Sequence, residues 1–221
     1  MNNIKHIIWD WNGTLLNDAW LFVKIMNQVL EKRGLKKITV KKYREIFCFP
    51  LESFYIKMGF DFKKESFEKS SFEFISLYSK HKNEADLYTG AKGLLFKLNK
   101  LGIKNYLLSA QNQQTLIDQV KFYKLFDFFD LIIGTDNLHA RGKDVVAKKI
   151  FNKIIPHNNQ ILMIGDTNLD INISKKFNCN AIGAGYGHQH IKRFENHKNL
   201  KIVSNFNQLD FYLTSLFQDN Q

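Results

Sequence analysis

The chain has 221 residues, of which 44% are hydrophobic and 14% aromatic, and its formal net charge is +11. This length and composition predict a globular protein with a full core, either one large domain or one domain that carries an insertion. Only a short apolar run precedes Asp10, and no run of about eighteen apolar residues occurs anywhere, which argues against a signal peptide and a membrane span and predicts a cytoplasmic protein.

Apolar runs of strand length alternate with helical patterns along most of the chain. This alternation predicts an α/β fold: a Rossmann-like parallel sheet core flanked by helices. The helical spacing of residues 91–101 stops at Gly102, and that of residues 145–155 stops at Pro156. The expected strands are residues 4–9, 104–109, 131–133, 160–164 and, more weakly, 180–183, and the expected crossover helices are residues 91–101, 113–123 and 145–155.

The alternation is interrupted directly after the first strand. Residues 17–87 contain no good strand pattern, and their apolar spacing is helical. Such a stretch is too long for an ordinary loop, so we expect an inserted all-helical cap domain on two hinges. Residues 1–16 and 88–221 then form the core. The helices expected in the cap are residues 19–32, 40–47, 51–58 and 63–82.

Carboxylates follow two of the expected strands. Asp10 comes directly after the first, and Asp166 after the run Ile161-Leu162-Met163-Ile164, with Asp170 four residues on. Carboxylates at the carboxyl ends of neighbouring parallel strands make a site for a hard cation and a phosphate. We expect Mg²⁺ at Asp10 and Asp166, supported by Asp170, which could instead only stabilise the start of its helix.

Phosphoryl transfer needs a nucleophile, donors to the phosphate oxygens and a positive side chain. Asp10 is the candidate nucleophile, and it would form an aspartyl-phosphate. Thr14 and the turn at Gly13 would supply donors to the phosphate. Ser109, at the end of a strand, would supply another, and Lys143 would hold a phosphate oxygen and Asp10 together, although neighbouring basic residues are rivals for that role.

With these segments in order, the chain resembles the haloacid dehalogenase superfamily of phosphohydrolases. The signatures of that family are a DxDGT loop, a strand-end Ser or Thr, a later Lys and a GDxxxD loop. The match covers nearly the whole chain, and the segment from Phe47 to Tyr55 is similar to the cap of the phosphoglycolate-phosphatase-like branch. The resemblance implies Ala110 as a further phosphate-binding residue and phosphoglycolate as the leading substrate.

One position departs from the family pattern. The residue two after the nucleophile is usually Asp, whose carbonyl binds Mg²⁺ and whose carboxyl protonates the leaving group; here it is Asn12. The carbonyl role survives, but an amide has no titratable proton, and general acid catalysis is typically worth about 10²- to 10⁴-fold. The sequence therefore predicts a phosphatase that is slow on alkyl phosphates, needs good leaving groups or keeps its phosphoenzyme. The alternative is a catalytically weakened protein that binds a phosphorylated ligand or partner.

The positive charge favours anionic partners. It is diffuse, and the densest cluster, Lys36-Lys37 with Lys41-Lys42, lacks the aromatic spacing of a base-stacking surface. We expect a small phosphorylated metabolite as the partner and no membrane, and we regard nucleic acid as the weaker alternative. The sequence does not determine the oligomeric state.

Several other residues attract attention without a clear role. Trp11 either walls the pocket beneath the cap or packs into the core. The histidines 139, 188 and 190 have no metal-type spacing, so we predict surface or loop positions for them. Cys48 and Cys179 are isolated, which indicates reduced thiols. Aromatic residues 49–55 could face the substrate or pack within the cap.

Overall fold

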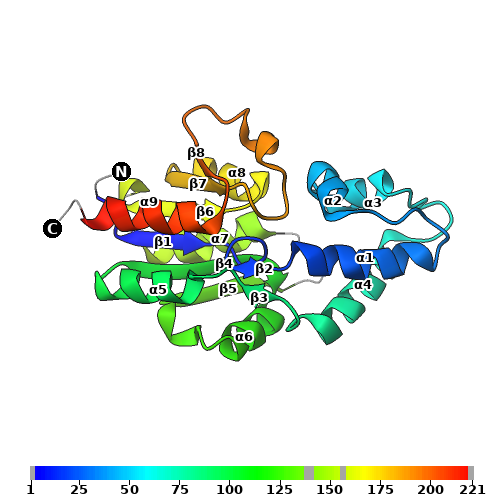
Figure 1. Cartoon of the computed structure of the whole chain (residues 1–221), viewed down its shortest axis with the longest axis horizontal. Helices are drawn as coiled ribbons and strands as arrows, with labels where there is room; N and C mark the ends of the chain where they lie inside the picture. Colours follow the sequence, from blue (N-terminus) through cyan, green and yellow to red (C-terminus); the bar gives the residue numbers. More distant parts are fainter. Residues whose placement is uncertain (1–2, 137–141, 155–157, 219–221) are drawn as a thin grey trace.

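A six-stranded sheet lies at the centre of the computed structural model, which describes residues 3–136, 142–154 and 158–218. All its neighbouring strands are parallel, in the order β5-β4-β1-β6-β7-β8 (Figure 1). The first strand therefore lies between β4 and β6, which brings the ends of all three to one edge of the sheet. The strands are β1 (His6–Trp9), β4 (Lys104–Asn112), β5 (Leu131–Thr135), β6 (Ile161–Gly165), β7 (Asn180–Ala184) and β8 (Lys201–Val203).

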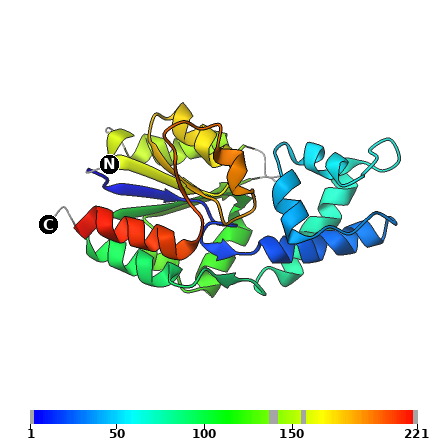
Figure 2. The same ribbon diagram turned by 45° about the horizontal axis from the view of Figure 1, so that its top comes forward.

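Helices cover both faces of this sheet, as Figures 1 and 2 show. Alternate residues of β1 point to opposite faces: Ile7 and Trp9 belong to one buried cluster and Ile8 to another. The cluster around Trp9 takes in α5 (Ala91–Lys100), α6 (Gln113–Phe122) and α9 (Phe206–Gln218), and the cluster around Ile8 takes in α7 (Lys143–Lys153) and α8 (Asn168–Lys176). Short 3₁₀ turns span Phe126–Phe128, Asn158–Gln160 and Ile191–Phe194.

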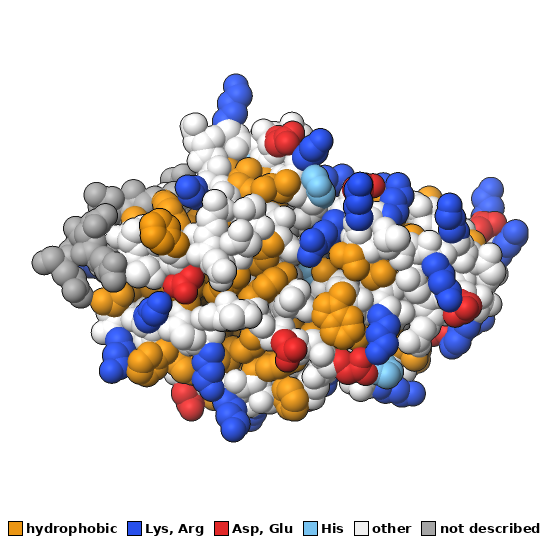
Figure 3. Space-filling model, viewed as in Figure 1, with side chains coloured by type: hydrophobic (Ala, Val, Ile, Leu, Met, Phe, Trp, Pro, Cys, Tyr) orange, Lys and Arg blue, Asp and Glu red, His pale blue; other side chains and the backbone are white. Residues whose placement is uncertain are grey.

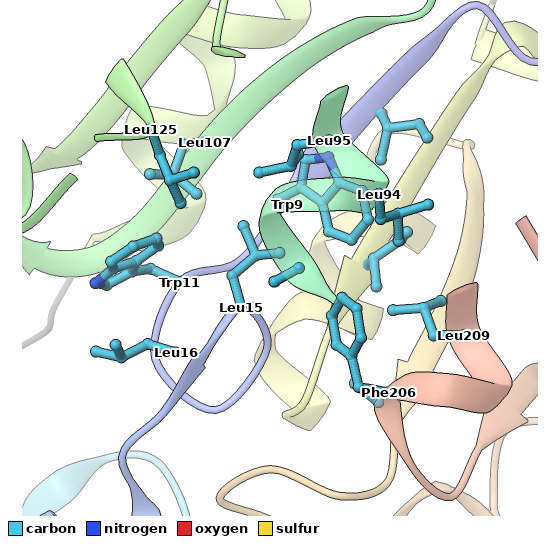
Figure 4. Packing of buried hydrophobic residues seen from close by; sticks show 14 of the residues in the cluster. Trp9, Trp11, Leu15, Leu16, Leu94, Leu95, Leu107, Leu125, Phe206 and Leu209 are labelled. Carbon is cyan, nitrogen blue, oxygen red and sulfur yellow. The ribbon is translucent and has the colours of Figure 1, made fainter. Parts of the chain in front are cut away.

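The larger cluster fixes the strand that carries Asp10. Figure 4 shows Trp9 beside Leu94 and Leu95 of α5, with Phe206 and Leu209 of α9 close by. The Trp9 ring is fully buried, and its Nε1 donates to Asn105 Oδ1 on the neighbouring strand at 2.7 Å. Full burial of a large aromatic side chain contributes about 1.5–3 kcal/mol, so this packing holds the end of β1 in place.

Four helices form a second body, which we call the cap: α1 (Ala19–Glu31), α2 (Val40–Ile46), α3 (Leu51–Lys57) and α4 (Phe67–His81). These helices have a buried cluster of their own, around residues such as Val29, Tyr43 and Phe54. Phe22 and Phe74 pack against both this cluster and that of the core. The cap lies at the right in Figures 1 and 2, beyond the edge of the sheet where the strands end.

The two connections between core and cap pair with each other. Strand β2 (Leu16–Asn17) enters the cap, β3 (Asp86–Leu87) leaves it, and the two are antiparallel. The backbone N–H of Tyr88 extends the pairing by donating to the Leu15 carbonyl at 3.0 Å. This ribbon lies at the expected hinges, and we keep residues 16/17 and 87/88 as our proposed domain boundaries.

The predicted fold class is confirmed, and each expected strand and helix matches an observed one with shifts at the ends. The last cap helix begins at Phe67 and not at 63, because Ser66 caps it by accepting from the Lys69 N–H at 3.3 Å. The prediction missed β2, β3, β8 and α9; the three strands have at most three residues each, too few for a periodic pattern. Pro156, where the last expected crossover helix stops, lies outside the described residues.

The surface matches the diffuse charge expected from the sequence. Figure 3 shows Lys and Arg side chains spread over the viewed faces of core and cap, with Asp and Glu among them. Within the described ranges, none of the helices is long and apolar enough to cross a membrane.

Candidate active site

Asp10 lies at the carboxyl edge of the sheet, one residue beyond β1. Its backbone N–H donates to the carbonyl of Ile164 on β6 at 2.9 Å, so the residue continues the parallel pairing. The residue is only 6% exposed. Burial first, and then the negative charge of Asp170, raise the pKa of Asp10, although Lys143 opposes the shift.

The loop after Asp10 folds tightly against Asp166. The N–H groups of Thr14, Leu15 and Leu16 all donate to the carbonyl of Trp11, and Gly13 has φ +76°. A Cβ at Gly13 would collide with the Asp166 carboxyl, as would one at Gly187. Only glycine permits both the left-handed backbone and this close approach. The hydroxyl of Thr14 is fully buried and donates to Asp10 Oδ2 at 3.4 Å.

The charged form of Asp166 is strongly disfavoured by its surroundings. It follows β6, is fully buried, and accepts a hydrogen bond from the backbone N–H of His188 through Oδ2. Its Oδ1 is buried without a hydrogen-bond partner among the described residues. Burial, followed by the charges of Asp10 and Asp170, raises the pKa of Asp166 well above its usual range. A cation beside Oδ1 would give that oxygen a partner and would favour the charged form of Asp166.

Lys143 connects two of the carboxylates. It is the first residue of α7, and its Nζ donates to Asp10 Oδ1 and to Asp170 Oδ1. Burial disfavours its charge, but the two carboxylates outweigh burial and raise the pKa of Lys143. The remaining oxygen of Asp170 accepts from the N–H of Thr167 at 3.0 Å and from its hydroxyl at 2.7 Å, which caps α8.

The three aspartates fit a magnesium ion. Asp10, Asp166 and Asp170 each offer an oxygen, and these oxygens lie within 4.8 Å of one another. Carboxylate oxygens are the ligands that Mg²⁺ prefers. Asp166 has an oxygen free to bind the ion, whereas both oxygens of Asp170 already accept from Lys143 and Thr167.

Ser109 and Ala110 lie near the end of β4, which runs on to Asn112. Ser109 is 1% exposed, and its Oγ accepts from the Gln111 N–H at 3.1 Å. Both residues line a cavity of about 280 Å³ between core and cap. Among the predicted site residues, Asp10, Asn12, Ser109, Ala110, Lys143 and Asp166 line this cavity; Gly13, Thr14 and Asp170 stand behind them.

A buried polar network that the sequence did not reveal surrounds Asn12. Its Nδ2 donates to Asp18 Oδ2 at 2.7 Å and to the hydroxyl of Tyr78 at 2.9 Å. Asp18 is fully buried, and its Oδ1 also accepts from the Gly13 N–H at 2.9 Å. Both N–H groups of Asn12 are thus engaged, which leaves its Oδ1 as the atom available to a ligand. The sequence placed Asp18 just before a helix, but nothing there signalled the network.

His188 belongs to this network; it lies in a loop, which is one of the two positions predicted for it, but it is buried there and not at the surface. It is 3% exposed, with Nε2 facing Asp18 Oδ1 at 3.0 Å and Nδ1 facing the Tyr43 hydroxyl at 2.6 Å. Because a carboxylate only accepts, Nε2 donates to Asp18, and Nδ1 shares the second hydrogen bond with the Tyr43 hydroxyl. Burial and then Asp18 raise the pKa of Tyr43, which keeps that hydroxyl protonated. His188 thus ties a core loop to the cap.

The other residues singled out in the sequence lie in different environments. Trp11 is fully buried in the core cluster, its Nε1 donates to Gln119 Oε1 at 3.3 Å, and the residues described as lining the cavity do not include it. His190 is partly exposed in a loop, whereas His139 lies outside the described residues. Both cysteines are free thiols. In the cap, Phe49 and Tyr55 line the cavity, while Phe54 packs inside the helical cluster.

The fold and the site together define an α/β enzyme with a carboxylate cluster at the strand ends, covered by a helical cap. Residues 7–184 match the model of the haloacid dehalogenase-like hydrolase family. The chain therefore belongs to the haloacid dehalogenase-like hydrolases, as the sequence motifs predicted, and is an enzyme.

Named relatives are distant but cover most of the chain. A pyrophosphatase, PpaX, from Halalkalibacterium halodurans is 22% identical over 87% of this chain and 90% of its own length. A phosphoglycolate phosphatase from Vibrio cholerae is 23% identical over 86% and 88%. Among solved structures, a haloacid dehalogenase-like hydrolase from Streptococcus pneumoniae superposes with a TM-score of 0.81 at 22% identity, over 96% of this chain and 100% of that one. That structural likeness shows the same fold.

Proposed function

We propose that this protein is a Mg²⁺-dependent phosphomonoester hydrolase that acts on a small phosphorylated metabolite. One observation carries the proposal: Asp10 shares a buried, cavity-facing cluster with Asp166, whose Oδ1 lacks a partner in the described structure, and with Lys143, which bonds Asp10. A carboxylate nucleophile, a cation site and a fixed positive charge are the parts that phosphoryl transfer requires. The names of the distant relatives agree with this reaction class.

In the proposed mechanism, Asp10 attacks phosphorus and the leaving-group oxygen departs, which gives an aspartyl-phosphate that water then hydrolyses. Ser109 and Lys143 steady the phosphoryl oxygens, together with backbone N–H groups near Gly13 and Ala110. Thr14, buried behind the nucleophile, acts by donating to Asp10 Oδ2. Asp170 acts by holding Lys143 and Thr167.

Asp10, Asp166 and the backbone carbonyl of Asn12 would hold the magnesium ion, with Asp170 behind them. When bound, the ion would screen the charge of the phosphate. Phosphoglycolate is favoured only by likeness to relatives such as the Vibrio cholerae phosphoglycolate phosphatase at 23% identity, and likeness of fold does not fix a substrate. The cavity itself favours another substrate class.

The test is phosphate release from p-nitrophenyl phosphate by protein stripped of metal with EDTA, with and without added Mg²⁺. We expect release only with Mg²⁺, and no release by the Asp10→Asn variant in either condition. Asp144→Asn is the matched control, because that carboxylate lies on α7 next to Lys143 but pairs outward with Lys176 at 2.9 Å.

The alternative, a catalytically weakened protein that only binds phosphorylated ligands, is motivated by Asn12. It predicts Mg²⁺-dependent binding of a phosphate ester with no phosphate release from the wild-type protein. Release that Asp10→Asn abolishes and Asp144→Asn retains would rule this alternative out. Release that is the same in Asp10→Asn as in the wild type would refute the proposed nucleophile.

A further inference from the structure

The cavity has two chemically different ends. The end formed by the core carries the charged groups Asp10, Lys143 and Asp166. The end formed by the cap is a wall of rings from α1, α3, α4 and the segment between α2 and α3. The aromatic residues of this wall that line the cavity are Phe22, Phe47, Phe49, Tyr55, Phe74 and Tyr78.

The rings of this wall support one another. Phe22 meets Tyr78 edge-on with centroids 5.0 Å apart, and it lies 5.3 Å from Phe74. Phe47 and Phe49 meet edge-on at 5.5 Å. Aromatic pairs in these arrangements contribute about 0.5–1.5 kcal/mol beyond their buried area, so the wall is a preformed surface whose shape suits a flat apolar group.

The wall offers no positive charge. The described residues that line the cavity include one cation, Lys143, and that side chain is already paired with Asp10 and Asp170. The cap is rich in Lys and Arg, but those whose partners the structure shows point elsewhere; Arg44, for example, donates to the carbonyl of Tyr186 at 2.7 Å. An anionic leaving group such as the carboxylate of glycolate would lie unpaired against rings, which is strongly unfavourable.

Neutral polar groups are present instead. Gln111 lines the cavity where core and cap meet, and its Nε2 donates to Gln119 Oε1 at 2.8 Å. Its Oε1 is buried and has no hydrogen-bond partner in the described part of the chain. This oxygen can accept from a hydroxyl or N–H on a substrate, so it suits an uncharged ring with a polar substituent.

Asn12 provides a second, independent constraint, which concerns the leaving group. Its two N–H groups donate to Asp18 and Tyr78, so the atom left for the substrate is an amide oxygen that can only accept. His188 lines the same cavity, but both of its ring nitrogens are engaged, with Asp18 and with Tyr43. Neither Asn12 nor His188 is thus free to protonate the departing oxygen, so the site favours a substrate that loses an oxygen stable as an anion.

Phenolic oxygens satisfy both constraints. A phenol has a pKa of about 10, far below that of an aliphatic alcohol, so it departs without a proton donor, and its ring is flat and apolar. We propose that the chain hydrolyses aryl phosphates, that is, phosphomonoesters of a phenolic hydroxyl on an uncharged ring. This inference rests on the phosphatase function proposed above.

The proposed hydrolysis has two steps, formation of an aspartyl-phosphate and its hydrolysis. Asp10 Oδ forms a bond to phosphorus while the bond from phosphorus to the aryl oxygen breaks, and the electron pair leaves on the phenolate, which then takes a proton from solvent. Water next attacks the phosphorus of the aspartyl-phosphate. This step releases inorganic phosphate and the free carboxylate of Asp10, and the proton of the attacking water goes to phosphate or solvent.

The test compares three esters with Mg²⁺ present: phenyl phosphate, benzyl phosphate and phosphoglycolate. Benzyl phosphate keeps the ring but loses an alkoxide, so it separates ring recognition from leaving-group chemistry. We expect phenyl and benzyl phosphate to show similar KM values, and kcat for phenyl phosphate to be at least about 100-fold higher, the size of a missing general acid. Phosphoglycolate should show a higher KM than either.

A series of ring-substituted phenyl phosphates adds a measurement that needs no variant. We expect log kcat to fall steadily as the leaving-group pKa rises. In Asn12→Asp, whose fold is checked by circular dichroism, the slope should flatten and benzyl phosphate should gain most. A phosphotyrosine peptide tests whether the aryl group of the substrate belongs to a protein. Turnover equal to that of phenyl phosphate indicates a protein substrate, and poor turnover indicates a free metabolite. Both results agree with hydrolysis of an aryl phosphate.

The inference is overturned if wild-type protein turns over phosphoglycolate or benzyl phosphate as fast as phenyl phosphate, or if kcat is independent of leaving-group pKa. Failure of the proposed function looks different: no ester is cleaved, p-nitrophenyl phosphate included, or cleavage persists in Asp10→Asn.

Discussion

The core end of the cavity is lined by charged side chains, whereas the cap end is lined by aromatic rings. At the core end, charged side chains are buried and meet one another: Lys143 is 3% exposed and Asp166 fully buried. At the cap end, rings pack against rings, and the charges of the cap form ion pairs at its surface, such as that of Arg33 with Glu73 at 2.8 Å. In our proposal, this difference means that the core performs the reaction and the cap selects the group that leaves.

The substitution with the largest expected effect on stability and activity is at the core end. Lys143→Met removes the cation between Asp10 and Asp170 and leaves two buried carboxylates without it. Loss of one partner from a buried ion pair costs about 3–5 kcal/mol, so thermal unfolding should shift down by many degrees and activity should vanish. Lys176→Met is the control, because its partner Asp144 is half exposed; equal losses in both variants would contradict the comparison.

Asp166→Asn separates function from stability at the same end. We expect kcat/KM to fall about 100-fold or more, since a catalytic metal supplies several kcal/mol. The metal-free variant should nevertheless unfold at a higher temperature than the metal-free wild type, because burial and two neighbouring carboxylates raise the pKa of Asp166 and so destabilise its charged form at neutral pH. Steady-state kinetics with Mg²⁺ measure the first effect, and melting curves without Mg²⁺ measure the second. A metal-free variant that melts at a lower temperature than the metal-free wild type would refute this reasoning.

Asp18→Asn acts on the junction between the two ends. The carboxylate accepts from Asn12, Gly13 and His188, and an amide cannot accept all of these bonds. Losing buried hydrogen bonds to a charged group costs about 1.5–3 kcal/mol. We expect lower stability in urea unfolding and a change in kcat with little change in KM for phenyl phosphate. A variant with the stability and kcat of the wild type would show that the network does not position Asn12.

The smallest effect belongs to the cap surface. Arg33 bonds Glu65 and Glu73, and its hydrogen bond, followed by those of Ser70 and Lys69, lowers the pKa of Glu65 to about 2. Because the folded pKa lies below the unfolded one, this stabilisation is present above pH 4.5 and is lost as the pH falls toward 2. Arg33→Met should cost about 1 kcal/mol at pH 7 and progressively less in urea titrations toward pH 3. A cost that stays constant with pH would contradict it.

The sequence predicted the core end of the site far better than the junction. Asp10 and Asp166 follow long apolar strands, so the parallel sheet itself brings them together, and Lys143 and Ser109 follow from the same alternation. The network of Asp18, His188 and Tyr43 joins residues up to 170 positions apart. Neither periodicity nor spacing reports such contacts, and a loop histidine in an unpatterned segment looks like any other until the cap is folded over it.

The paired ribbon of β2 and β3 brings both chain crossings between core and cap together. The two crossings are hydrogen-bonded to each other, so the four helices are joined covalently to the core at one place. Asp18 stands beside that ribbon and holds the N–H of Gly13 and the amide of Asn12. One carboxylate beside the hinge ribbon thus fixes two groups of the loop that follows Asp10, so a change at the hinge reaches that loop through a single side chain.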